Sequence, residues 1–267
     1  MWGLAGVTGS RVLLRIEDHD RERSRPAFDA AIIEDLAWLG FVPDAGPVRQ
    51  REDAGPYEAA VEVLRRGDRA YACDCTRATF ATWARAHGRG WQGPGCPSGC
   101  RERALPEDED LTLRAAIGTG AEPWQDRILG PRTGEAADAG DPPIRDRHGN
   151  WTYGFAVVVD DLRQSISLVV RGEDLAQATP AQIRLGRLLG RDMPPAFAHH
   201  PLIHKPGGAK LSKADGDTGV RELREAGWGA SRVIGAAAAA VGLVAGEDVV
   251  PAAATELVDR FVRSRGG

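Results

Sequence analysis

Three short apolar runs, each followed by charged residues, most constrain the fold of this 267-residue chain. They occupy residues 12–16, 155–159 and 166–170. Runs of this length are typical of strands buried inside a sheet. Segments with helical signals occupy residues 26–39, 57–66 and 180–189. Two of these predicted helices begin at a proline, a residue that favours the first helical turn. Strands that alternate with helices indicate an α/β fold built on a parallel sheet.

The rest of the chain divides around this pattern. Residues 102–150 are rich in glycine, proline, aspartate and arginine, and they predict an insertion of short strands and loops. The tail predicts helices at about 218–226, 231–243 and 251–263. We therefore expect four segments: residues 1–71 and 151–214 as two halves of the α/β domain, 72–150 as an inserted subdomain and 215–267 as a short helical tail.

Composition excludes several classes of protein. The net charge is −4, so binding to nucleic acid requires a local basic patch. Four cysteines are too few for a disulfide scaffold of this length. The sequence shows neither a signal peptide nor an apolar run long enough to span a bilayer, which predicts a cytoplasmic protein with reduced thiols and no membrane partner. Neither a G-x-G-x-x-G between a strand and a helix nor a P-loop motif supports a dehydrogenase or a P-loop nucleotidase.

The cysteines form two close pairs, Cys73-x-Cys75 and Cys96-x3-Cys100, separated by twenty residues. Two such pairs can supply the four thiolates of a tetrahedral site, and Zn²⁺ suits four soft ligands. Because four protein ligands leave no position for water, we expect one structural zinc ion per chain. The alternatives are four unrelated buried thiols or disulfides, and disulfides are disfavoured in a cytoplasmic protein.

Lysine is confined to one segment of the chain. Of the 34 basic residues, only Lys205, Lys210 and Lys213 are lysines. The lysine ammonium is a compact point charge on a flexible side chain, and arginine cannot replace it where a phosphate must be bound by an ammonium. Residues 207–214 read GGAKLSKA, and such a glycine-rich loop can close over a triphosphate. The alternative is chance clustering on a solvated loop.

Several blocks of sequence resemble the glutamyl-tRNA synthetases, a family of class I aminoacyl-tRNA synthetases. Residues 210–214 (KLSKA) resemble the KMSKS signature, and residues 13–20 (LLRIEDHD) resemble the family's LLRIEDTD block. The blocks that resemble YQFAVVVDD, IRGEDL and FAHLPLI occupy residues 153–161, 170–175 and 197–203. The blocks keep the family's order over about residues 11–215. The resemblance implies a Rossmann-like catalytic domain with an inserted zinc-containing subdomain and a short helical tail.

The resemblance also implies a reaction, the activation of L-glutamate by ATP with Mg²⁺ bridging the phosphates. By family motif, Glu17 would accept the glutamate ammonium, Tyr153 would position the substrate and Arg171 would clamp the side-chain carboxylate. Lys213 would contact an ATP phosphate, with Lys210 assisting. Such a reaction needs positioning and charge neutralisation rather than a side-chain nucleophile. Taken singly, each residue has a structural alternative: Glu17 as a surface acid, Tyr153 as a core aromatic and Arg171 as an ion-pair partner. Only their occurrence together, in the order of the family's blocks, favours a functional role.

Two features resemble one branch of the family, the glutamyl-queuosine tRNA(Asp) synthetases. The zinc site of that branch has the pattern C-x-C followed by Y-x3-C, and Cys96 stands here at the tyrosine's place. About 53 residues follow the lysine loop, where a glutamyl-tRNA synthetase has a large anticodon-binding region. The branch resemblance implies that glutamate is esterified onto the queuosine base of tRNA(Asp). The short tail lacks a coiled-coil pattern, which favours a monomer.

One departure from the family changes these expectations. Family members begin with a strand that reads approximately RFAPSPTG and a HIGH-type segment, whereas this chain begins MWGLA. We therefore expect the sheet to lack a strand and ATP binding to be weak or absent. As the reason we favour a misplaced start codon or a truncated gene model over a purpose-built fragment. The alternatives are an inactive zinc-stabilised module that binds tRNA or a partner, and a fragment of an ordinary glutamyl-tRNA synthetase. We assign no metal to His199, His200 and His204, because they lack supporting ligands.

Overall fold

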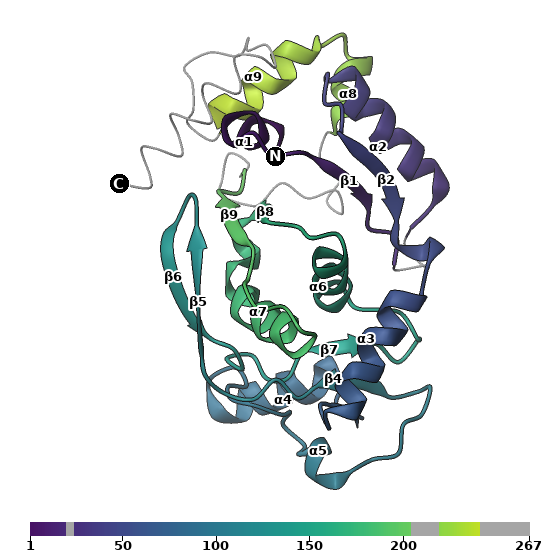
Figure 1. Cartoon of the computed structure of the whole chain (residues 1–267), viewed down its shortest axis with the longest axis vertical. Helices are drawn as coiled ribbons and strands as arrows, with labels where there is room; N and C mark the ends of the chain where they lie inside the picture. The colour runs from purple at the N-terminus through teal and green to yellow at the C-terminus, as the bar shows by residue number, and fades with distance from the viewer. Residues whose placement is uncertain (20–23, 204–218, 241–267) are drawn as a thin grey trace.

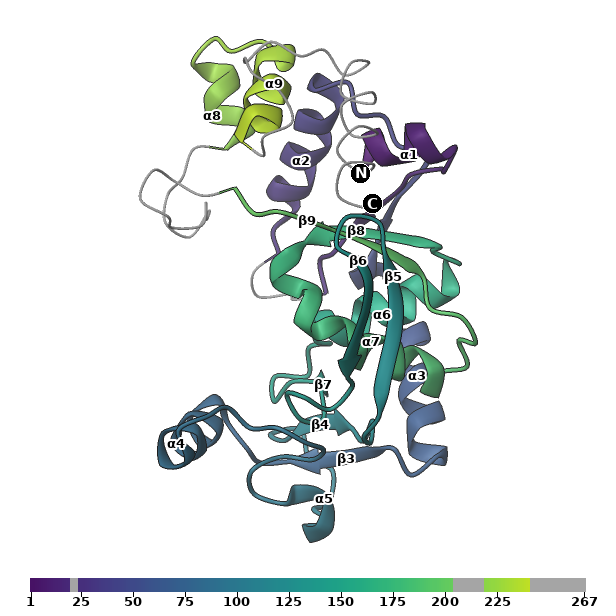
Figure 2. The same ribbon diagram turned by 90° about the vertical axis from the view of Figure 1, so that its left-hand side faces the viewer.

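The structure is a computed structural model that describes residues 1–19, 24–203 and 219–240 (Figure 1). One end of its long axis holds α1 (Trp2–Thr8), α8 (Val220–Glu225) and α9 (Ala230–Ala240). The opposite end holds β3 (Ala70–Cys73), α4 (Arg77–His87) and α5 (Cys100–Arg103) (Figure 2). Among the described residues, the predicted functional segments therefore occupy two places, a central α/β region and a cysteine-bearing end.

The described strands form three sheets. β1 (Leu13–Ile16) pairs in parallel with β2 (Ala45–Arg49). β3 forms an antiparallel sheet with β4 (Thr112–Ala115) and β7 (Pro143–Arg145). The largest sheet has the order β6-β5-β9-β8 and consists of β5 (Ala121–Asp126), β6 (Gly130–Glu135), β8 (Leu168–Gly172) and β9 (Ala196–His200). Within it β8, β9 and β5 run parallel, whereas β6 is antiparallel to β5.

The hairpin β5-β6 adds an antiparallel strand to the expected parallel sheet. Only three residues connect the two strands, and so short a connection permits only antiparallel pairing. The hairpin comes from the segment predicted as an insertion, yet Asp126 of β5 pairs with Phe197 of β9. The Arg127 N–H also donates to the Phe197 carbonyl oxygen at 2.7 Å. Through this pairing, strands of the predicted insertion join the sheet that contains β8.

The prediction of a strand at residues 155–159 is wrong, because these residues lie in helix α6 (Tyr153–Arg163). Six consecutive residues, from Phe155 to Asp160, are buried. The helix packs against α3 (Gly55–Arg66), α7 (Thr179–Leu188) and β7. Because these neighbours bury most of the helix surface, residues 155–159 form a continuous apolar run, and periodicity alone cannot tell such a short run from a buried strand.

Most of the other predicted elements are confirmed. The run at residues 12–16 is β1, and the run at 166–170 is β8, displaced toward the carboxyl end. The predicted helices correspond to α2 (Pro26–Trp38), α3 and α7, and short 3-10 helices span Gln50–Glu52 and Glu173–Ala178. In the tail, α8 and α9 confirm the first two helices in their described part, and the third lies outside the described residues. Among the helices the structure describes, none is long and apolar enough to cross a membrane.

A cavity separates the pair β1-β2 from the four-stranded sheet. In the part of the chain that the structure describes, β1 pairs only with β2 and β8 pairs only with β9, so each has an edge without a partner strand. The space between these edges measures about 800 Å³ and is bordered by residues 11–15 and 167–171. Gly46 allows β2 to lie close to β1, because its φ of 94° suits glycine and any Cβ there would collide with the Leu14 carbonyl oxygen.

Candidate active site

The cavity between β1 and β8 brings together three predicted substrate-binding residues. Glu17 follows the carboxyl end of β1, Arg171 lies near the carboxyl end of β8, and Tyr153 begins α6. All three line the cavity. In α/β sheets ligands bind beyond the carboxyl ends of the strands, so the three side chains lie at the expected edge. The other two predicted residues, Lys210 and Lys213, lie outside the described residues.

The Tyr153 phenol feels the charges of both Glu17 and Arg171. Burial raises the pKa of the Tyr153 phenol and the charge of Glu17 raises it further, whereas Arg171 opposes the shift. The phenol is therefore protonated at neutral pH and can donate a hydrogen bond. An acid, a neutral hydroxyl and a cation around one cavity match the ammonium and carboxylate groups of an acidic amino acid.

Arg171 is held on every side by hydrogen-bond acceptors of the protein. Its guanidinium donates to His199 Nε2 at 3.1 Å, Gln182 Oε1 at 2.6 Å, Thr179 Oγ1 at 2.8 Å and the Leu175 carbonyl oxygen at 3.4 Å. The residue is only 8% exposed, and this burial lowers the pKa of Arg171. Of the five N–H groups of a guanidinium, these bonds use four, which leaves one Nη1 N–H for Tyr153 or a ligand. A bidentate clamp on a ligand therefore requires one of these protein contacts to yield.

His199 connects Arg171 to a buried carboxylate. The Nδ1 atom of His199 contacts Oδ2 of Asp126, while Nε2 accepts from Arg171. Arginine only donates, so Nε2 carries no proton and the neutral ring carries its proton on Nδ1. Asp126 also accepts the backbone N–H groups of Ile128 and Leu129, each at 2.9 Å. Burial raises the pKa of Asp126, but hydrogen bonds from His199 and the backbone outweigh it and hold the pKa at about 2.

Asp126 and His199 were not predicted as parts of this site. The parallel register places His199 beside Arg171, and the single pairing of β5 with β9 brings in Asp126. The position of His199 near the end of an apolar strand was a weak signal. No local pattern could have linked Asp126 to β9, because the two lie more than seventy residues apart in the sequence.

The opposite wall of the cavity is tied to α6 by a second polar network. Arg15 Nη1 donates to Asp161 Oδ1 and Gln164 Oε1, each at 2.9 Å, and Arg15 Nη2 lies 3.3 Å from a Glu17 carboxylate oxygen. Burial raises the pKa of Asp161, and the positive charge of Arg15 opposes this shift. These contacts fix β1 against α6 and therefore fix Glu17 relative to Tyr153.

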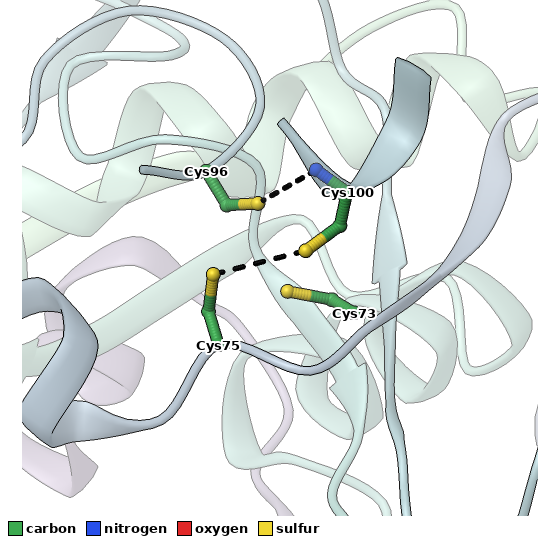
Figure 3. A group of neighbouring side chains, drawn as sticks. All are labelled: Cys73, Cys75, Cys96 and Cys100. Atoms are coloured by element: carbon green, nitrogen blue, oxygen red, sulfur yellow. Dashed lines mark hydrogen bonds between the residues drawn. The ribbon is translucent and has the colours of Figure 1, made fainter. Parts of the chain in front are cut away.

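The four cysteines form a separate candidate metal centre at the far end of the molecule. Figure 3 shows their sulfur atoms pointing toward one another, and all lie within 4.8 Å of one another. Cys73 and Cys75 come from the end of β3, whereas Cys96 and Cys100 come from a loop and the start of α5. Gly95 and Gly99 both have positive φ angles, which lets this loop fold tightly around the sulfurs.

The donor set of this centre fits a tetrahedral metal ion. A zinc ion with Zn–S bonds of about 2.3 Å separates neighbouring sulfurs by about 3.8 Å. The Cys75 and Cys100 sulfurs lie 3.8 Å apart. Arg114 Nε donates to the Cys73 sulfur at 3.1 Å, and the Cys100 N–H donates to the Cys96 sulfur at 3.4 Å, contacts that favour thiolates. All four cysteines are buried, so the cluster could hold a metal away from water.

The class of protein follows from comparison with known families. The family model for the catalytic domain of class I tRNA synthetases (E and Q) matches residues 1–239. The chain belongs to this family, in agreement with the resemblance of its sequence blocks.

Particular relatives fall into two named groups. A glutamyl-Q tRNA(Asp) synthetase of Symbiobacterium thermophilum is 38% identical over 280 residues, which cover 99% of this chain and 86% of that protein. A glutamate–tRNA ligase of a Synechococcus species is 39% identical over 241 residues, which cover 85% of this chain and 49% of that protein. The chain thus spans about half the length of that ligase. A crystal structure of a glutamate tRNA ligase from Elizabethkingia meningosepticum, in complex with its amino acid, superimposes with a TM-score of 0.74 at 26% identity, covering 96% of this chain and 59% of that chain.

Proposed function

We propose that this chain activates L-glutamate with ATP and esterifies it onto the queuosine base of tRNA(Asp). In the first step a glutamate carboxylate oxygen attacks the α-phosphorus of ATP and pyrophosphate leaves. In the second step a hydroxyl of the queuosine base attacks the activated carbonyl and AMP leaves. Both steps depend on holding charged reactants in line, which requires positioning and electrostatics rather than a nucleophilic side chain.

The observation that carries the choice of glutamate is the convergence of Glu17, Tyr153 and Arg171 on one cavity. In the proposed complex Glu17 accepts the substrate ammonium and Tyr153 donates to a substrate oxygen. Arg171 supplies its remaining Nη1 N–H and its positive charge to the side-chain carboxylate. The buried network around Arg171 keeps the guanidinium in place before the substrate arrives, which avoids a loss of side-chain entropy on binding.

The extent of similarity along the chain supports queuosine as the acceptor. Similarity to the Symbiobacterium glutamyl-Q tRNA(Asp) synthetase extends over 99% of this chain, against 85% for the Synechococcus glutamate–tRNA ligase. The cysteine pattern resembles that of the same branch. Transfer of glutamate to the 3′ end of a tRNA is the second candidate, because relatives named glutamate–tRNA ligases are equally similar in their shared region.

We further propose that Cys73, Cys75, Cys96 and Cys100 hold one structural zinc ion. The close approach of four buried sulfurs supports this assignment. With four protein ligands the ion has no open position, so it stabilises the inserted segment and takes no part in the reaction. Lys210 and Lys213 stay predicted ligands of the ATP phosphates, with Mg²⁺ bridging those phosphates. The cytoplasmic location and the monomeric state also stay predictions.

Glutamate-dependent exchange of labelled pyrophosphate into ATP tests the first step. We expect exchange with glutamate and none with glutamine or aspartate. The acceptor is tested with tRNA(Asp) that contains or lacks queuosine, and we expect labelled glutamate only on the modified tRNA. Equal labelling of both tRNAs would contradict the proposed acceptor, and labelling of the 3′ end of tRNA(Glu) would favour the second candidate.

A further inference from the structure

The segment between the two cysteine pairs has an unusual charge distribution. Residues 75–101 contain no aspartate or glutamate, and this is the longest acid-free stretch of a chain with 38 acidic residues. The same segment holds Arg77, Arg85, Arg89 and Arg101. Among the described residues, no ion pair holds Arg77, Arg85 or Arg89. A local basic surface therefore exists on a protein whose net charge is −4.

Stacked rings lie on this basic surface, on helix α4. The His87 ring stacks on Trp83 with centroids 4.0 Å apart and planes 9° from parallel. Trp91 meets Trp83 edge-on at 5.0 Å, and the Arg89 guanidinium carbon lies 5.7 Å from the centre of the Trp83 ring. His87 Nδ1 donates to the Trp83 carbonyl oxygen at 2.8 Å, which fixes the histidine ring in the stack.

These rings do not belong to the apolar core of the cysteine-bearing segment. That core consists of the four cysteines, Tyr71 and Ala116, with Phe80 and Leu105 packed against it. His87 is exposed, and one of its faces is covered by Trp83 while no described ring is stacked on the other. A shallow groove of about 530 Å³ runs along α4 past Trp83 and His87, with Pro97 and Ser98 on its border. Figure 2 shows α4 at the edge of the molecule, at the end opposite α8 and α9.

An exposed aromatic ring flanked by unpaired arginines matches one kind of ligand. An unpaired nucleotide offers a flat base that extends a ring stack and a phosphate that takes an arginine. An acidic peptide would use the arginines but would leave the open ring face unused. We propose that Trp83, His87, Arg85 and Arg89, here called the α4 platform, bind an unpaired base and its neighbouring phosphates in the tRNA substrate. This proposal rests on the proposed function for the identity of the RNA, whereas the stacking chemistry does not depend on it.

Binding of fluorescein-labelled tRNA(Asp), followed by anisotropy at constant salt, tests the stack. We expect His87→Ala to weaken binding about tenfold, which is about 1.4 kcal/mol, because the base loses the ring on which it stacks. His87→Phe retains a flat ring and should bind within about twofold of the unaltered chain. The matched control is His148→Ala, since His148 is an exposed histidine on a turn distant in sequence. Equal binding by the His87→Ala and His148→Ala variants would overturn the proposal.

The salt dependence of the same binding tests the arginines. Each phosphate contact contributes about 0.7 to the slope of log K against log salt for single-stranded RNA. The double variant R85Q/R89Q should lower this slope by about 1 to 1.5. The control R66Q/R147Q removes two exposed arginines elsewhere and should leave the slope unchanged. A slope that falls equally in both double variants would show a diffuse charge effect and overturn the assignment to α4.

Two further measurements separate this proposal from others. A polyglutamate peptide should fail to displace the RNA at equal charge concentration, and displacement would indicate an acidic-protein site instead. Glutamate-dependent pyrophosphate exchange is measured on the same variants and should be unchanged in His87→Ala. Exchange that is absent even in a chain restored at its N-terminus, with tRNA binding that still depends on His87, would refute the proposed enzyme and leave the α4 platform supported.

Discussion

The Arg171 network and the four-cysteine cluster are both buried and polar, but they are completed in different ways. Arg171 obtains its acceptors from the chain itself, through His199, Gln182 and Thr179. The four cysteine sulfurs lie at distances from one another that suit a shared ion, although Cys73 also contacts Arg114 and Cys100 contacts Asp74. The Arg171 network therefore has all its hydrogen-bond partners within the folded chain and holds the guanidinium in place without a ligand. The second cluster needs a ligand from outside before its sulfurs are satisfied as thiolates.

The largest expected effect tests the incomplete cluster. Cys73→Ser removes one ligand from the proposed zinc site, and the three remaining sulfurs hold the ion poorly. Because metal binding contributes directly to folding, we expect the free energy of unfolding to fall by at least about 4 kcal/mol. Metal analysis should give one zinc ion per unaltered chain and much less in the variant. Glu102→Gln, on the same short helix as Cys100, is the control and should keep the metal. An unaltered chain that is equally stable with and without a chelator would contradict the zinc proposal.

The next effect tests the complete cluster through the proposed reaction. Arg171→Lys keeps the positive charge but loses the fork of donors that reaches His199, Gln182 and Thr179. We expect kcat/KM for glutamate in pyrophosphate exchange to fall at least about 100-fold, with zinc content unchanged. Arg184→Lys is a comparison variant, because Arg184 also donates to several acceptors but lies outside the cavity lining. An equal loss in both variants would show that Arg171 acts through stability alone.

A smaller effect is the dependence of stability on acid pH. The folded protein holds the pKa of Asp126 at about 2, below the ordinary value of 3.8. A carboxylate with a lowered pKa stabilises the fold at pH values above its ordinary pKa, and this stabilisation is lost as the pH falls from about 4 to about 2. Asp126 is 5% exposed, so solvent screens the interaction little. We expect about 2 kcal/mol of the unfolding free energy to disappear over this range, and Asp126→Asn to remove that part of the pH dependence. Urea unfolding at pH 5, 4, 3 and 2 measures this loss, and parallel curves for both proteins would contradict the assignment.

The two clusters also differ in how far the sequence predicted them. All four cysteines lie within residues 73–100, so their spacing alone indicated a shared site. The Arg171 network joins β5, β8, β9 and α7, and only Arg171 could be proposed, from a family block. Short-range spacing is visible in a sequence, whereas contacts made by strand pairing depend on register and topology.

The same distinction explains the errors in the fold. Helices α2, α3 and α7 were predicted because their start and stop signals are local. Helix α6 was predicted as a strand because its burial against α3, α7 and β7 produces a short continuous apolar run, and that burial is a tertiary property. The place of the hairpin β5-β6 beside β9 could not be predicted, since a single pairing at Asp126 makes the connection.

The smallest expected effect comes from removing the two hydrogen bonds of His199 one at a time. This experiment tests whether the bond between His199 and Arg171 positions the guanidinium. His199→Gln places an acceptor near the position of Nε2 and keeps the bond from Arg171, while it loses the donor to Asp126. His199→Asn keeps a donor near the position of Nδ1 and loses the acceptor for Arg171. If the network acts by positioning Arg171, the Asn variant should raise KM for glutamate about tenfold with little change in kcat, whereas the Gln variant should raise it about twofold. The unfolding free energies of both variants, measured in urea, provide the control. The contrary outcome is that KM rises with loss of stability, so that the less stable variant binds glutamate less well whichever hydrogen bond it retains. In that case His199 contributes to packing of the core and does not position Arg171.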